Sequence, residues 1–179
     1  RAVSGIGYEV FGMSGGTVEL AGSITTERAY PYVPQLFLGG GTLKSMVDWS
    51  TDFYQYAMFE TWGDSRDTTK KTFTLDTNGK TTTFRSAMQG NANVKLTGAG
   101  SFVADDGVQG GVSGHWTVEN TGAANLKNAA AFADGLTVAP GSHVEIDIGD
   151  RSTYVSLAVL CSATNALGGN EFTQDNFYS

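Results

Sequence analysis

Residues 71–86 read Lys-Thr-Phe-Thr-Leu-Asp-Thr-Asn-Gly-Lys-Thr-Thr-Thr-Phe-Arg-Ser, and this stretch decides the fold class that the sequence predicts. Asn-Gly at 78–79 lies between two alternating runs, which is the strongest short signal for a β-hairpin with a two-residue type I′ loop. In that register Phe73, Leu75 and Phe84 share one face, and the opposite face is entirely polar. One apolar face and one wet face are typical of an antiparallel sheet.

A second hairpin is predicted over residues 136–148, where Pro140-Gly141 suits the central positions of a type II turn. Residues 154–162 are apolar on both faces, which indicates a central strand that is covered on both sides. A strand of this kind requires a second layer. The sequence therefore favours two packed sheets.

Shorter strand candidates are spread along the chain and are separated by closely spaced turn signals. They are residues 6–12, 17–25, 35–38, 93–97 and 114–119. Many short strands with frequent turns are typical of a sandwich or a barrel. We therefore expect residues 1–179 to form a single all-β domain, an antiparallel two-sheet sandwich of the jelly-roll kind, without an internal repeat.

Two segments carry a helical period and are predicted as short helices in connections. In residues 42–49, Thr42 suits an N-cap and the apolar residues share one helical face; a strand is expected within residues 53–62. In residues 123–134, Leu126 and three alanines recur at helical spacing before Gly135. An Ala-rich irregular connection is the alternative for this second segment.

The composition describes a globular chain with an unusually neutral surface. Hydrophobic residues make up 40% and charged residues only 16%, against about 25% charged in an average domain. The net charge is -7, and the Lys and Arg residues are scattered, so no basic stripe is available to neutralise phosphates. The longest apolar stretch, Val155 to Cys161, is far shorter than the roughly 20 residues of a spanning helix. Direct nucleic-acid binding and membrane insertion are therefore not expected.

The sequence contains no recognisable catalytic or metal-binding motif, so no catalytic residue, no metal site and no cofactor are expected. His115 and His143 are the only histidines, and neither belongs to a nucleophile motif. Cys161 is the only cysteine and is expected to be a buried, inert thiol. Asp48 and Asp52 would share a helix face, but exposed charges near a helix end explain them better than an acid/base pair.

Two further groups of residues are candidate binding sites. His143, Glu145 and Asp147 share one strand face with Asp150 beyond it, which alternation alone explains better than a cation site. The densest aromatic cluster runs through residues 49–62. Aromatic residues at strand spacing more often build a core or a subunit interface than a sugar platform.

The stretch from Leu43 to Trp62, a helix followed by Tyr54-Gln-Tyr56-Ala-Met-Phe-Glu-Thr, resembles jelly-roll coat (capsid) proteins of small icosahedral viruses. The resemblance implies a structural subunit of a virion that assembles with copies of itself or sibling subunits through loop and edge contacts. The scarcity of clustered cations is unlike the many coat proteins that carry a basic arm.

The alternative is a secreted carbohydrate-binding or adhesin-like sandwich with an extracellular location. Its partner would be a glycan or a receptor, contacted by aromatic residues such as Trp49, Trp62 or Trp116. The acidic composition and the few lysines suit an extracellular protein. An enzyme is not expected.

Overall fold

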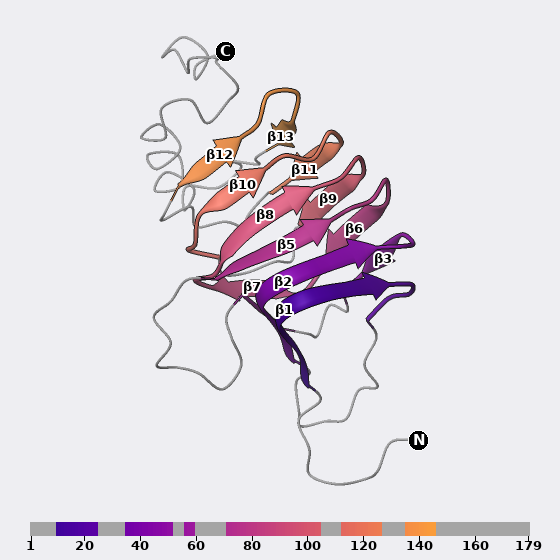
Figure 1. The fold of residues 1–179 in the computed structure, drawn as a ribbon, viewed down its shortest axis with the longest axis vertical. Helices are drawn as coiled ribbons and strands as arrows, with labels where there is room; N and C mark the ends of the chain where they lie inside the picture. Colours follow the sequence, from indigo (N-terminus) through magenta and orange to yellow (C-terminus); the bar gives the residue numbers. More distant parts are fainter. Residues whose placement is uncertain are drawn as a thin grey trace, which may run out of the picture.

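The computed structural model describes residues 10–24, 35–51, 56–59, 71–104, 112–126 and 135–145. These residues form strands and turns without a helix, and every strand pairing among them is parallel. The strands stack one above another along a single axis, as Figure 1 shows. The all-β prediction is therefore confirmed, and the antiparallel sandwich is wrong.

The described strands are all short except the first two. In chain order they are β1 (Val10–Leu20), β2 (Gln35–Ser45), β3 (Trp49–Ser50), β4 (Tyr56–Phe59), β5 (Thr72–Asp76), β6 (Thr81–Phe84), β7 (Ala87–Gly90), β8 (Asn93–Thr97), β9 (Ser101–Ala104), β10 (Trp116–Val118), β11 (Ala123–Asn125), β12 (Leu136–Val138) and β13 (His143–Glu145).

The strands line three faces of a solenoid. The first face has the order β12-β10-β8-β5-β2, with β1 beyond β2, and the second face has the order β13-β11-β9-β6-β3. The third face contains the first halves of β1 and β2, which pair with each other, followed by β4 and then β7. An isolated bridge joins Gly90, at the end of β7, to Val112. The described residues thus lie in six coils: 10–24, 35–51, 56–59 with 71–86, 87–104, 112–126 and 135–145.

Each coil repeats the same alternation of inward and outward side chains. On the first face Leu43, Leu75, Leu96, Val118 and Val138 form one inward column. On the second face, partners in the column Thr82, Phe102, Ala124 and Val144 are 20, 22 and 20 positions apart. From coil 3 to coil 6 the structure therefore contains a repeat of about one coil per twenty residues, whereas Trp49 and Thr82, in coils 2 and 3, are 33 positions apart. The expectation of a chain without an internal repeat is wrong for these coils.

The predicted hairpin at 71–86 is a corner between two faces. Its turn chemistry is correct: Asn78 and Gly79 both have positive φ, and the Lys80 N–H donates to the Thr77 carbonyl at 2.8 Å. However, β5 pairs with β8, and β6 pairs with β9, both in parallel. The Thr77 N–H donates to the Thr97 carbonyl one coil later, so the two strands diverge instead of pairing with each other.

The second predicted hairpin is corrected in the same way. Gly141 has a φ of +83°, and the Ser142 N–H donates to the Ala139 carbonyl at 3.0 Å, as a type II turn requires. Its two strands, β12 and β13, nevertheless belong to different faces. The predicted central strand at 154–162 lies outside the described residues.

Neither predicted helix is found where the structure describes the chain. Residues 42–49 contain the end of β2, a turn and the start of β3, because Thr42, Leu43 and Lys44 pair with β5. Residues 123–125 form β11, and residues 127–134 lie outside the described part. A strand was expected within 53–62, and β4 lies there.

The parallel solenoid also corrects the jelly-roll assignment and the terms that depend on it. A jelly roll is built from antiparallel strands in two sheets, and none of the described pairings is antiparallel. The capsid and virion assignment has no support from this fold.

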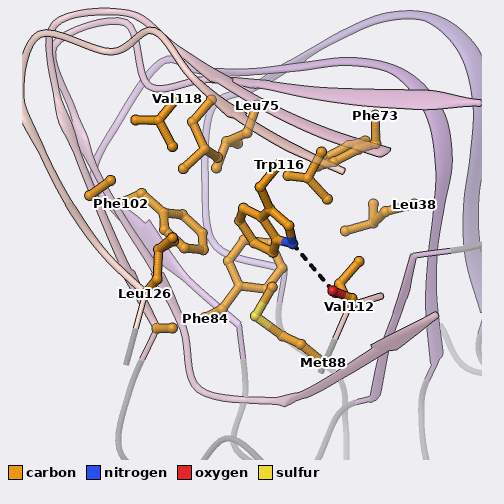
Figure 2. Close-up of a cluster of buried hydrophobic side chains, with 14 of the residues drawn as sticks. Leu38, Phe73, Leu75, Phe84, Met88, Phe102, Val112, Trp116, Val118 and Leu126 are labelled. Carbon is orange, nitrogen blue, oxygen red and sulfur yellow. Dashed lines mark hydrogen bonds between the residues drawn. The ribbon is translucent and has the colours of Figure 1, made fainter. Parts of the chain in front are cut away.

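The core occupies the interior of the solenoid and is continuous from coil to coil (Figure 2). Trp49, Phe84, Phe102 and Trp116 come from four successive coils, and neighbouring ring centroids are 5.6, 5.6 and 6.3 Å apart. The Trp116 indole N–H donates to the Val112 carbonyl at 3.3 Å. These rings connect coils 2 to 5 through their side chains, in addition to the backbone ladders.

Candidate functional site: the corners and side faces of the solenoid

The corner between the first and second faces is filled by small polar side chains. Ser45, Thr77 and Asn120 occupy equivalent positions there, and all three are fully buried. The Thr77 hydroxyl donates to the Thr97 carbonyl and accepts the Gly100 N–H, both at 2.9 Å. The Asn120 amide donates to the carbonyls of Gly100 and Gly122. The corner column therefore satisfies the backbone of the tight turns.

The same corner fixes the indole of Trp49 in coil 2. Its N–H donates to the Ser45 hydroxyl at 2.8 Å, and that hydroxyl lies 2.9 Å from the Thr82 hydroxyl. Trp49 is only 4% exposed. Its polar atom is thus held inside the solenoid and is not available on the surface.

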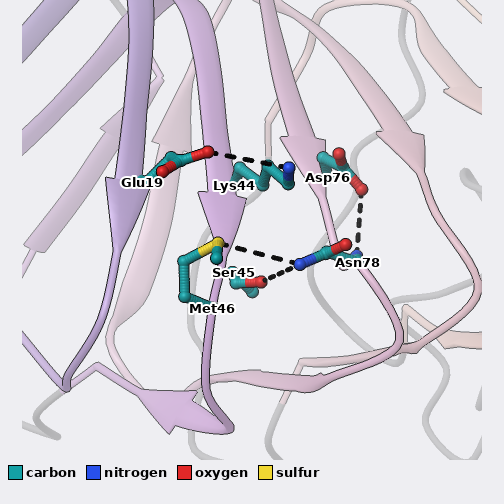
Figure 3. A network of polar contacts seen from close by, with 6 residues as sticks. All are labelled: Glu19, Lys44, Ser45, Met46, Asp76 and Asn78. Carbon is teal, nitrogen blue, oxygen red and sulfur yellow. Dashed lines mark hydrogen bonds and ion pairs between the residues drawn. The ribbon is translucent and has the colours of Figure 1, made fainter.

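A polar network outside this corner joins coils 1, 2 and 3 (Figure 3). The Asn78 side-chain amide donates to the Ser45 carbonyl at 3.0 Å, and the Asp76 carboxylate accepts the Asn78 N–H at 2.9 Å. Lys44 forms an ion pair with Glu19 at 3.6 Å. The Asn-Gly motif therefore supplies a contact between coils besides its turn geometry.

Outward columns on the first face carry hydroxyls and paired charges. Lys95 and Glu119 of adjacent coils form an ion pair at 2.8 Å, and both side chains are more than one-third exposed. Exposed ion pairs of this kind contribute little to stability. The outer surface of the first face is consequently polar, with charges of both signs.

Thr51 closes the end of the second face in coil 2. It is buried, and its hydroxyl accepts the Arg85 N–H at 2.8 Å and the Ser86 N–H and hydroxyl at 3.1 Å each. Coil 3 turns away after β6 at these two residues. A single hydroxyl therefore satisfies the backbone of the next coil at its bend.

Replacing Thr51 with Val is expected to destabilise the protein by about 2 to 3 kcal/mol, because the part-buried N–H of Arg85 and the buried N–H and hydroxyl of Ser86 lose an acceptor while the side-chain shape is retained. Urea denaturation followed by circular dichroism measures the loss. The matched control is Thr83→Val, on the outward side of β6, for which a change below about 0.5 kcal/mol is expected. Equal effects of the two substitutions would contradict this role of Thr51.

The two histidines lie on outward positions of different faces. His115 precedes β10, and its Nε2 lies 2.9 Å from the Thr137 hydroxyl. His143 is exposed at the start of β13. Within the described ranges, no three His, Cys, Asp or Glu side chains are grouped so that they could hold a metal ion.

Asp48 lies between β2 and β3 and not on the predicted helix, so the helix face predicted to carry Asp48 is wrong. Its carboxylate accepts the Thr81 N–H at 2.8 Å and links coil 2 to coil 3. Asp52, Asp147, Asp150 and Cys161 lie outside the described residues, and the side chain of Glu145 is not described.

The aromatic platform proposed for sugars is not formed by Trp49 or Trp116. Both side chains point into the core, and Trp116 is fully buried. Trp62 lies outside the described residues, and the side chains of β4 are not described. The buried polar residues were not predicted: they are Ser45, Thr77 and Asn120 at the corner and Thr51 at the end of the second face. Their only signal in the sequence is a polar residue next to a regular apolar alternation.

Comparison with known proteins found no matching family model, no matching curated protein and no matching solved structure. Across the ranges that the structure describes, no helix has the length and apolar character needed to cross a membrane. The corners and side faces are therefore the features on which a functional proposal must rest.

Proposed function

We propose that this chain acts as a rigid structural rod, the shaft of an adhesin-like protein that is secreted or displayed on a surface. The observation that carries the proposal is the uninterrupted parallel ladder on the first face, where each of the six coils pairs with the next. A rod of this kind keeps whatever is attached to its two ends at a fixed separation.

Side-chain packing supports the same role. The aromatic series Trp49, Phe84, Phe102 and Trp116 links four coils inside the solenoid, and the corner hydroxyls link coils through their turns. Because each coil contacts mainly its neighbours, the stability of such a rod is approximately a sum over adjacent coils. Bending at one point would break both the ladder and the core.

The polar outer surface fits a shaft exposed to solvent. The outward columns hold Thr residues and paired charges, and the tryptophans that could have bound sugar by stacking are buried at positions 49 and 116. An adhesin-like protein therefore fits these features, without a sugar-binding role for Trp49 or Trp116.

Duplication of one coil tests the rod directly. Repeating residues 93–114 once is expected to lengthen the molecule by about 4.8 Å, the spacing of adjacent strands, with the fold retained. Spin labels on cysteines at the exposed Gly22 and the partly exposed Ser142, in a Cys161→Ser background, report the distance by double electron–electron resonance.

Duplication of residues 115–134 repeats the test at another coil. It should increase the distance between the two labels by the same amount. The unmodified chain should show one narrow distance distribution. A broad distribution, or a distance that both insertions leave unchanged, would show that the chain is not a rod.

A further inference from the structure

Among the methionines whose side chains the structure describes, only Met46 is exposed. It lies in the turn between β2 and β3, and its exposed fraction is 38%, against 6% for Met13 and 0% for Met88. An oxidant in solution can therefore reach the Met46 sulfur while the coils stay closed. The two buried sulfurs become accessible only when the coils open locally.

A hydrogen-bond donor from coil 3 lies beside the Met46 sulfur. The Asn78 side-chain nitrogen is 3.8 Å from this sulfur and donates to it, as Figure 3 shows. The same nitrogen donates to the Ser45 carbonyl at 3.0 Å, and the Asp76 carboxylate accepts the Asn78 N–H at 2.9 Å. Because these two bonds hold Asn78 in its turn, the donor has a defined position on one side of the sulfur.

The backbone of Met46 is held as well. Its N–H donates to the Leu20 carbonyl of coil 1 at 2.9 Å. A thioether sulfur is a weak acceptor, so its contact with the Asn78 amide is weak. An oxygen atom attached to this sulfur would be a much stronger acceptor for the same amide.

We propose that Met46 is a modification site, at which hydrogen peroxide forms methionine sulfoxide and Asn78 directs the new oxygen to one side of the sulfur. A lone pair of the sulfur attacks one peroxide oxygen, and the O–O bond breaks. The departing hydroxide removes the proton from the transferred oxygen and leaves as water. The sulfur is oxidised by two electrons, and the peroxide is reduced by two.

The position of Asn78 makes the reaction selective for one of the two sulfoxide epimers. The sulfoxide sulfur is chiral, and oxygen transfer to one lone pair or the other gives opposite epimers. The Asn78 amide donates to the oxygen that projects toward it while it keeps its bond to the Ser45 carbonyl. This epimer therefore predominates. The modification strengthens a polar contact between coils 2 and 3 and does not depend on the proposed function as a rod.

Oxidation of the full chain with dilute hydrogen peroxide tests the accessibility of the sulfur. Digestion and mass spectrometry at successive times give the rate for each methionine. Met46 should be oxidised at least about tenfold faster than Met13 or Met88, because the buried residues wait for local opening of the coils. Met46→Leu should lack the early product and retain the circular dichroism spectrum of the parent chain.

The epimer ratio tests the role of Asn78. Two classes of methionine sulfoxide reductase each reduce one epimer, so separate treatment of the digested peptides with each class gives the ratio at Met46. The folded parent chain should show an excess of at least about threefold, the ratio that a hydrogen bond of typical net strength produces. The same chain oxidised in concentrated urea should give nearly equal epimers.

Variants separate the amide from the rest of the network. Asn78→Gly suits the positive φ of this turn and removes the amide, so it should give nearly equal epimers. Lys44→Gln removes the ion pair with Glu19 in the same network and should retain the excess of the parent chain. Circular dichroism confirms that each variant is folded, and Asn78→Asp replaces Asn78→Gly if the latter does not fold.

Three results would each overturn the proposal. They are oxidation of Met46 no faster than that of Met13 and Met88, equal epimers in the folded parent chain, and an undiminished epimer excess after removal of the Asn78 amide.

Discussion

Truncation of Trp116 to Ala is expected to destabilise the protein by about 3 to 5 kcal/mol, the range measured for large aromatic residues removed from a core. Trp116 is fully buried, packs against Phe102 and donates its indole N–H to the Val112 carbonyl. The substitution leaves a cavity between coils 4 and 5 and an unsatisfied carbonyl at Val112. Because domains are stable by only about 5 to 15 kcal/mol, the variant should be close to unfolding at 25 °C.

Urea denaturation of the parent chain and the variant gives the difference in unfolding free energy. The matched control is Thr117→Ala, which changes the next residue of β10 on its outward side and should cost less than about 1 kcal/mol. Trp116→Phe should lie between the two, because it retains part of the ring. A loss below about 1 kcal/mol for Trp116→Ala would mean that the ring is not a core contact between coils.

A single methyl group at Gly100 is expected to disrupt the corner between coils 3 and 4. A Cβ at this position would lie 2.0 Å from the Lys80 carbonyl oxygen and 2.4 Å from the Lys80 nitrogen. Both atoms belong to the backbone, so no side-chain rotation can relieve the overlap. Gly100→Ala should therefore destabilise the protein by about 3 kcal/mol or more, at the upper end of overpacking effects.

Gly22 supplies the control for this substitution, because a Cβ there would meet no heavy atom within 4 Å. Gly22→Ala should leave the thermal midpoint within about 2 °C of the parent chain. Gly122 occupies the equivalent turn one coil later, where a Cβ would lie 2.1 Å from the Gly100 carbonyl oxygen, and Gly122→Ala should resemble Gly100→Ala. Equal stability of all three variants would contradict the close stacking of the turns.

The positions of the short strands and turns follow from the sequence, but the sequence does not show which strands pair with each other. Alternation in residues 71–86 correctly places Phe73, Leu75 and Phe84 inside and predicts the positive φ at 78–79. The same alternation suits a hairpin and a solenoid corner equally well. In a hairpin the strand at 72–76 pairs with the strand at 81–84, and in a solenoid it pairs with residues about twenty positions away. No residue within 71–86 distinguishes the two arrangements.

A column-by-column comparison would have revealed the solenoid. The pairs Val94 and Leu96, Trp116 and Val118, and Leu136 and Val138 occupy the same inward positions on the first face of successive coils. The three pairs are all apolar, but only Val118 and Val138 are the same residue type at an equivalent position. The helical spacing of apolar residues at 42–49 led to a wrong helix prediction for a related reason. Leu43 and Val47 can share a helical face, yet the backbone of Leu43 pairs with Leu75 and Val47 lies in a turn as an exposed side chain.

The candidate site was predictable only in part. The sequence analysis predicted no metal or cofactor site, and that remains a prediction. The polar corner residues could not be recognised in advance, because Ser45, Thr51 and Thr77 resemble any hydroxyl residue at a strand end. Their role depends on backbone groups that other coils bring to them, such as the Gly100 N–H at Thr77.

The near-constant separation between column partners from coil 3 onward also bears on how quickly such a chain can fold. Along the second face from β6 to β13, each new strand joins a neighbour only 20 or 22 positions earlier, whereas β6 itself joins β3 across 33 positions. The entropy of loop closure grows with the length of the loop that is closed, so the entropic cost of adding a coil does not rise with the number already formed. Folding can begin at one pair of coils and propagate. We expect the folding rate to depend on that first pair and to be insensitive to the total length of the chain.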